Sequence, residues 1–186
     1  MTKKDDIIIA TSELLQLKGY HGTGINEIVE KSKSPKGSIY HYFKSGKDEI
    51  VKEALQFSGN IILSFLQEAS DTAGSAEKFV KIVFDKYTEE IENSGFQKGC
   101  PIAATALEVS GVHPELTTTI KGIYESWRSV IIEALKTDVT KSIGREKLAS
   151  NLISLLEGAL ISSKIMRSKE PLIIAKTAAL SLLQHD

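Results

Sequence analysis

Cysteine and proline are both scarce in this sequence of 186 residues. The single cysteine, Cys100, cannot form an intrachain disulfide, which excludes disulfide-stapled secreted classes and fits a reducing cytoplasm. Only four prolines occur, and because proline interrupts helix interiors, their scarcity permits long continuous helices. The two shortages favour a helical intracellular protein.

Long apolar runs are also missing. No segment approaches the roughly 18 consecutive apolar residues of a membrane span. The N-terminus, MTKKDDIIIATSELL, places acidic residues before a short apolar run and lacks the core of a signal peptide. We therefore predict a cytoplasmic protein without a membrane segment.

Motifs of enzymes and metal sites are absent as well. The four histidines are scattered, and none has a His or Cys three or four residues further on, as a metal site would need. No GxSxG elbow occurs, and Gly22 and Gly24 are followed by Glu27 where a dinucleotide fingerprint needs a third glycine. We predict no enzyme, no metal and no cofactor.

Net charge is only −1, yet one stretch is strongly basic. Five lysines and no acidic residue occur between Lys31 and Lys47. Phosphate backbones attract such a patch, and hydroxyl and phenol groups can be positioned against phosphate oxygens. The charge alone also fits a solvated helix face, or a basic turn that binds a protein or an anionic lipid.

The same stretch predicts two short helices with a tight break between them. Thr23 is expected to cap the first, which carries an apolar stripe over residues 25–29. At Ser34 and Pro35 the chain restarts, with the serine as cap and the proline at the first helical position. In the second helix Ile39 and Phe43 are four residues apart and are expected to face inward. This arrangement fits a helix-turn-helix with its second helix in the major groove.

Helical patterns continue along the rest of the chain. Ser45 is expected to cap the helix predicted from residue 47, with Asp48 as its capping-box partner. We predict an all-α protein of about nine helices, with an N-terminal three-helix helix-turn-helix domain (1–46) and a C-terminal helical domain (47–186). The predicted helices outside the DNA-reading stretch cover residues 3–18, 47–69, 76–93, 101–110, 115–136, 146–167 and 171–184.

The last two predicted helices are apolar over more than one face. Such helices must be buried on more than one side. A second copy of the chain could cover them in a twofold dimer, which is the commonest assembly, and a fully intramolecular core is the alternative. A dimer would also place two recognition helices about one DNA turn apart, as a palindromic site requires.

The segment PKGSIYHYFKSGKDEI, with GYHGTGINEIVEKS before it, resembles the N-terminal DNA-binding domain of the TetR family of transcriptional regulators. The likeness covers roughly the first fifty residues and follows the family pattern Gly-Thr/Ser-hydrophobic-Tyr-x-His/Tyr-Phe. Lys33 and Ser34 depart from the more apolar turn of the family. Further on, GCPIAATALEVS resembles the LmrA/YxaF-like subgroup.

This resemblance implies DNA contacts at eight positions of the sequence. One set would hold phosphates and the other would approach base edges in the major groove. The predicted phosphate contacts are Thr23, Tyr40, Tyr42 and Lys47, and the predicted groove contacts are Lys36, Gly37, Ser38 and His41.

The resemblance also implies an effector cavity in the second domain, although aromatics at helical spacing equally serve as ordinary core. Tyr and Trp need partners for their polar tips when buried, and a cavity or ligand could supply them. The predicted lining comprises Phe65, Phe84, Tyr87, Phe96, Tyr124 and Trp127, bordered by Cys100, Ala104, Leu107 and Glu108.

Together these features predict a TetR-like regulator. We expect a homodimeric repressor that leaves a palindromic operator when a small apolar or aromatic effector binds. The alternative is a helical interaction module without sequence-specific DNA binding. Activation instead of repression depends on operator position and not on this chain.

Overall fold

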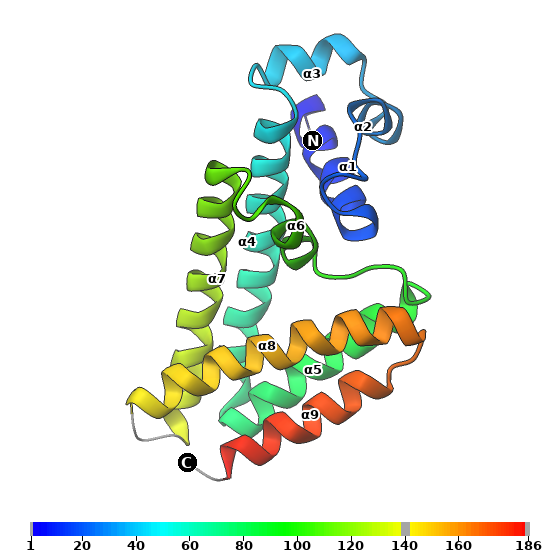
Figure 1. Cartoon of the computed structure of the whole chain (residues 1–186). Helices are drawn as coiled ribbons and strands as arrows, with labels where there is room; N and C mark the ends of the chain where they lie inside the picture. Colours follow the sequence, from blue (N-terminus) through cyan, green and yellow to red (C-terminus); the bar gives the residue numbers. More distant parts are fainter. Residues whose placement is uncertain (1, 139–141, 185–186) are drawn as a thin grey trace. The chain divides into compact units, whose positions relative to one another are not determined.

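The computed structural model describes residues 2–138 and 142–184, and within these ranges all regular structure is helical (Figure 1). The predicted all-α class is confirmed, with nine α-helices and one 3-10 turn in the described residues. By internal contacts the chain forms two compact units, residues 1–61 with 100–123, and residues 62–99 with 124–186. The functional boundary at residue 46 stays a prediction.

Unit 1 is built around the N-terminal helices. Its first helix has the predicted bounds and a reciprocal cap, in which the Thr2 hydroxyl accepts from the Asp5 N–H at 3.2 Å and the Asp5 carboxylate accepts from the Thr2 N–H at 2.7 Å. The helices that contribute to the unit are α1 (Lys3–Lys18), α2 (Ile25–Ser32), α3 (Lys36–Tyr42), the start of α4 (Lys47–Ala73), α6 (Pro101–Val109) and the start of α7 (Pro114–Ala134).

The core of unit 1 lies where α1 packs against α2 and α3. Ile39 and Phe43 are fully buried there, as their spacing predicts. Helix α1 also packs against α6, although the two helices are far apart in the sequence. The buried core side chains are Ile7, Leu14, Ile28, Ile39, Phe43 and Ile50.

Two predicted helix caps are wrong by one residue. Gly24, not Thr23, caps α2, and its N–H donates to the Glu27 carboxylate at 3.3 Å. The Thr23 side chain turns inward and its hydroxyl donates to the Gly19 carbonyl at 2.7 Å. Likewise Pro35 rather than Ser34 precedes α3, where no side chain caps the helix. In both places a preferred capping residue uses its hydroxyl for a local turn instead.

The cap predicted for α4 also differs. The Ser45 N–H donates to the Glu49 carboxylate at 2.8 Å, so Glu49 takes the role predicted for Asp48. Asp48 is then available for contacts outside its own helix. The helix continues to Ala73, beyond the predicted end at residue 69, and stops at Gly74, whose φ of +70° suits glycine.

Unit 2 contains a layer in which α9 (Glu170–Leu183) packs against α8 (Ser142–Met166) and α5 (Ala76–Asn93), as Figure 1 shows. Helix α5 has the predicted bounds. The 3-10 turn η1 (Leu135–Thr137) extends α7 past residue 134. The loop predicted over residues 137–144 is shorter, because α8 begins at residue 142, and residues 139–141 lie outside the described ranges.

Helix α8 has one property that its sequence pattern did not lead us to expect. Its segment Gly144–Met166, 23 residues long, is long and apolar enough to cross a membrane by length and composition alone. Of the most apolar 18-residue stretch in this segment, 33% is buried in the structure. Several large apolar side chains of α8 are exposed, led by Ile165 at 76% and Met166 at 69%. The helix therefore carries an uncovered apolar face within this single chain.

Candidate DNA interface and effector cavity

Helix α3 presents a polar face built on an apolar anchor. Ile39 and Phe43 fix one side of the helix in the core, and this turns the intervening residues outward. Tyr40 is 54% exposed, so it is not part of the core. At Gly37 an added Cβ would meet nothing within 4 Å, which leaves room for a partner to approach the backbone closely. The predicted contacts on this face are Lys36, Gly37, Ser38, Tyr40, His41 and Tyr42.

The basic patch is only partly available to a partner. Lys33 adopts a left-handed conformation with φ 51° at the end of α2, and it is exposed together with Lys36 and Lys44. Lys31 instead forms an ion pair with Glu13 at 2.7 Å. The exposed lysines flank α3 at both ends, which is where phosphates of a bound duplex would lie.

Two predicted phosphate contacts, Thr23 and Lys47, are not on this exposed face. Thr23 is fully buried. The Lys47 ammonium donates to the Tyr20 carbonyl at 2.7 Å and lies 4.0 Å from the centre of the Tyr20 ring. Burial lowers the pKa of Lys47, although the charges of Asp48 and Glu108 oppose the shift. In this structure both side chains instead bind backbone carbonyls of the loop between α1 and α2.

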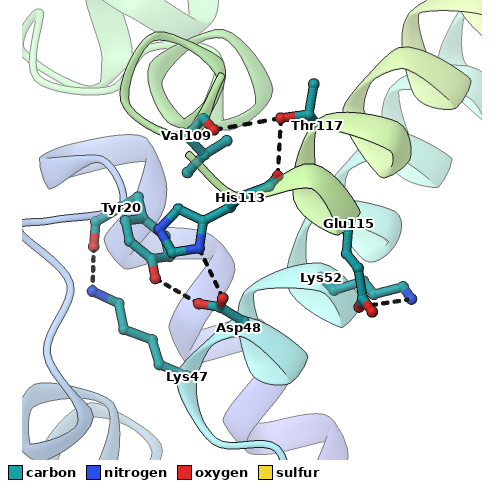
Figure 2. A network of polar contacts seen from close by, with 8 residues as sticks. All are labelled: Tyr20, Lys47, Asp48, Lys52, Val109, His113, Glu115 and Thr117. Carbon is teal, nitrogen blue, oxygen red and sulfur yellow. Dashed lines mark hydrogen bonds and ion pairs between the residues drawn. The ribbon is translucent and has the colours of Figure 1, made fainter. Parts of the chain in front are cut away.

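Unit 1 also contains a polar cluster that joins three segments far apart in the sequence (Figure 2). The Tyr20 hydroxyl donates to Asp48 Oδ1 at 2.5 Å. A hydrogen bond of 2.9 Å joins His113 Nδ1 to Asp48 Oδ2, and the Tyr20 and His113 rings are 4.8 Å apart between centroids. We call Tyr20, Asp48 and His113 the Asp48 clasp. It ties the α1–α2 loop and the start of α4 to the α6–α7 turn.

A second contact reinforces this connection. The His21 N–H donates to Glu108 Oε2 at 2.5 Å, so the end of α6 meets the α1–α2 loop directly. An added Cβ at Gly19 would lie 2.1 Å from Glu108 Oε1, which shows how closely the two segments approach. Sequence reasoning placed Glu108 beside an effector cavity and missed this contact.

Electrostatics in the clasp favour a charged Asp48 and a neutral Tyr20. Burial, with the hydrogen bond and charge of Asp48, raises the pKa of Tyr20 well above its usual range. Burial alone would raise the pKa of Asp48, but hydrogen bonds from Tyr20 and His113 outweigh it and hold that pKa below its ordinary value of 3.8. The phenol is therefore a donor and the carboxylate an acceptor across the neutral pH range.

The raised pKa of Tyr20 predicts a loss of stability in alkali. The unfolded chain loses the phenol proton near its ordinary pKa of 10.0, whereas the folded chain retains it. The contribution is therefore fully present below that pH and is lost as the pH rises. The unfolding free energy lost by Tyr20→Phe should shrink between about pH 8 and about pH 11 in urea titrations. If the loss caused by Tyr20→Phe is the same at both pH values, the phenol proton does not contribute to stability.

Unit 2 contains a small apolar cavity of about 40 Å³. Helices α4, α5, α7 and α8 each contribute to its wall. Of the predicted effector residues it includes Phe84, Tyr87 and Trp127. The other lining side chains are Ile62, Leu66, Phe79, Val80, Val83, Ile131, Leu152, Ile153, Leu156, Glu157 and Leu160.

The remaining predicted effector residues do not line this cavity. The Phe65 ring lies 6.5 Å from the Tyr87 ring, and the Tyr124 ring lies 5.2 Å from the Trp127 ring, so both are close behind the wall. Phe96 lies in the turn after α5 and has a φ of 62°. The four bordering residues belong to unit 1, where Leu107 is 79% exposed; they are Cys100, Ala104, Leu107 and Glu108.

Two family models match the chain. Residues 7–54 match "Bacterial regulatory proteins, tetR family", and residues 76–178 match "Transcriptional regulator LmrA/YxaF-like, C-terminal domain". The chain belongs to the TetR family of transcriptional regulators. The HTH-type transcriptional regulator YxaF of Bacillus subtilis (strain 168) is 30% identical to this TetR-family chain over 171 residues, which is 92% of this chain and 90% of YxaF.

Solved structures give the same fold. Regulatory protein TetR from Rhodobacter sphaeroides has a TM-score of 0.87 and 21% identity, covering 95% of this TetR-family chain and 96% of that chain. The TetR-family regulator CifR, solved as a cysteine mutant with 26 bp double-strand operator DNA, has a TM-score of 0.82 and 18% identity, covering 95% and 94%. These likenesses show the TetR fold, and the two family models make the chain a DNA-binding transcriptional regulator.

Proposed function

We propose that this TetR-family regulator is a repressor that binds a palindromic operator as a homodimer through α3. The observation that carries the proposal is the exposed polar face from Lys36 to Tyr42, held on the buried anchors Ile39 and Phe43. A recognition helix needs this combination of a fixed register and protruding donors. The operator complex of the structurally similar CifR supports DNA as the partner.

Dimerisation would occur through α8 and α9. These two helices expose large apolar side chains although each also packs inside unit 2. A second copy related by a twofold axis would cover the same face on both partners. It would also account for an α8 that is apolar enough to resemble a membrane helix in a cytoplasmic regulator. The exposed side chains are Ile161, Ile165, Met166, Ile173, Ile174 and Leu182.

A charge placed on this face should break the dimer. We expect Ile165→Glu to convert the protein to a monomer and to weaken operator binding, because a carboxylate at the dimer interface would be desolvated. Analytical ultracentrifugation checks the mass, with Ile61→Glu as a control at an isoleucine of α4 that is 55% exposed. A dimer that persists in Ile165→Glu would place the interface elsewhere.

An effector in the unit 2 cavity would act through two continuous helices. Helix α4 carries Ile62 and Leu66 of the cavity wall and begins beside Asp48, and α7 carries Trp127 and begins beside His113. A ligand shifts the balance between DNA-binding and released states only by its different affinity for the two. Because α4 and α7 each contribute to both the cavity and the Asp48 clasp, a ligand in the cavity could change the position of α3 through them.

In-vitro selection of duplexes from a random library, at physiological salt, tests the proposal. Recovery of an inverted repeat is expected, since two α3 helices in a symmetric dimer read the same half-site in opposite directions. A folded protein that enriches no sequence would instead favour the interaction-module alternative, in which charge alone attracts a partner.

A further inference from the structure

The turn between α2 and α3 contains a lysine in a backbone conformation that suits glycine. Lys33 has φ 51° and ψ 34°, which is the left-handed region. Its N–H donates to the Glu30 carbonyl at 3.2 Å, and the Ser34 N–H donates to the Val29 carbonyl at 3.3 Å. These two bonds form a Schellman motif, which usually has glycine at its left-handed position. A residue with a Cβ costs free energy there, so Lys33 lowers the stability of the turn.

The Lys33 side chain makes no contact that offsets this cost. It is exposed, and within the part of the chain that the structure describes its ammonium has no hydrogen bond or ion pair. Other lysines of unit 1 differ, since Lys31 pairs with Glu13 at 2.7 Å and Lys4 pairs with Glu53 at 2.7 Å. The stability of the fold therefore gives no reason for a lysine at this position, and a bound partner would supply one.

The position of Lys33 favours a phosphate as that partner. In a helix-turn-helix the first helix crosses the DNA backbone and the second enters the groove, so the turn between them lies close to phosphates. No acidic residue occurs between Lys31 and Lys47 in the sequence to compete for the ammonium. Lys36 at the start of α3 and Lys44 after its end are also exposed, and neither is paired among the described residues.

We propose that Lys33 binds a backbone phosphate of the bound DNA, so that one residue both strengthens DNA binding and destabilises the free protein. An ammonium binds phosphate as a point charge and does not need the fixed geometry of a guanidinium. The contact would position the duplex against α3 without reading its sequence. The inference rests on α3 as the proposed recognition helix and adds a phosphate contact to the eight positions expected from the sequence.

Three substitutions at residue 33 separate the charge from the backbone conformation. Lys33→Gly removes both the charge and the strain, Lys33→Ala removes the charge alone, and Lys33→Arg keeps both. We expect Lys33→Gly to melt above the parent chain and about 2–4 °C above Lys33→Ala, because glycine adopts the left-handed conformation without strain. Circular dichroism during heating measures the melting temperatures. If Lys33→Gly does not melt above the parent, the lysine does not destabilise the free protein and that half of the proposal is wrong.

DNA affinity should change in the opposite direction to stability. We expect Lys33→Gly and Lys33→Ala to weaken binding about fivefold for each half-site at physiological salt, and to reduce the slope of log affinity against log salt by up to about one per half-site. Lys33→Arg should bind within about twofold of the parent. Fluorescence anisotropy of a labelled duplex, titrated at several salt concentrations, measures both quantities.

Lys78→Ala, at an exposed lysine of α5, controls for a general loss of charge and should leave affinity and slope unchanged. An affinity and a salt slope that both stay at the parent values in Lys33→Gly would overturn the phosphate contact. Lys33→Ala lacks the same charge, so either of the two variants tests the contact if the other does not fold.

An arbitrary duplex, titrated beside a selected operator, separates this inference from the proposed function. A phosphate contact should weaken by the same factor on both, because phosphates carry no sequence information. A chain that enriches no inverted repeat, but loses affinity for the arbitrary duplex in Lys33→Gly, contradicts the palindromic operator and supports the Lys33 contact. A chain that binds a selected operator equally tightly with and without this lysine contradicts the Lys33 contact alone.

Discussion

Replacing Phe43 with alanine is expected to lower the free energy of unfolding by about 3–5 kcal/mol, the usual cost of removing a buried aromatic ring. The ring is fully buried at the end of α3 and belongs to the cluster that holds α1, α2 and α3 together. The Lys4 ammonium also lies 5.5 Å from the ring centre. A loss of this size approaches the whole stability of many domains, so operator binding should disappear as well.

The neighbouring aromatic residue provides a matched control. Tyr42 is 37% exposed, and Tyr42→Ala should change the free energy of unfolding by less than about 1 kcal/mol. Urea denaturation, followed by circular dichroism, compares the two variants. Equal losses would mean that Phe43 contributes no more packing than its exposed neighbour and that α3 is not anchored in this way.

Removing polar groups from the exposed face of α3 should weaken operator binding about 10- to 100-fold while leaving the fold intact. Lys36→Ala and Tyr40→Phe are the two variants, and each removes a contact of about 0.5–1.5 kcal/mol, which a symmetric dimer would make twice. Both side chains are exposed, so unfolding free energies should stay within about 0.5 kcal/mol of the parent.

The salt dependence of operator affinity distinguishes a lost charge from a lost hydrogen bond in the two variants. Lys36→Ala removes a positive charge from the groove and should reduce the slope of log affinity against log salt by up to about one per half-site. Tyr40→Phe keeps the charge and should leave the slope unchanged. Lys78→Ala, at an exposed lysine of α5, is the control for general loss of charge. If both α3 variants bind a selected operator as tightly as the parent, α3 is not the recognition helix.

The helices were largely predictable from the sequence. Lys3–Lys18 and Ala76–Asn93 have the expected bounds to the residue, because apolar spacing and good end signals agree there. The inward direction of Ile39 and Phe43 also followed from their spacing. Caps were less predictable, since a serine or threonine near a helix start can serve a turn instead, as Thr23 and Ser34 do.

The clasp could not be predicted. Asp48 is 28 residues from Tyr20 and 65 residues from His113, and no periodicity within a helix links positions so far apart. Tertiary contacts such as the packing of α6 against α1 bring these segments together. The cavity residues are a mixed case: the aromatic character of the wall was expected, but the carboxylate of Glu157 was not, because one acidic residue in a helix normally faces solvent.

The discontinuous make-up of unit 1 limits how freely this DNA-reading head can be exchanged between regulators. A chimaera joined at residue 46 would keep α1–α3 but would separate Tyr20 and His21 from their own partners, Asp48, Glu108 and His113. A transplanted head would then meet a foreign α6–α7 turn. A laboratory chimaera that keeps these contacts would therefore have to transfer residues 47–61 and 100–123 together with α1–α3.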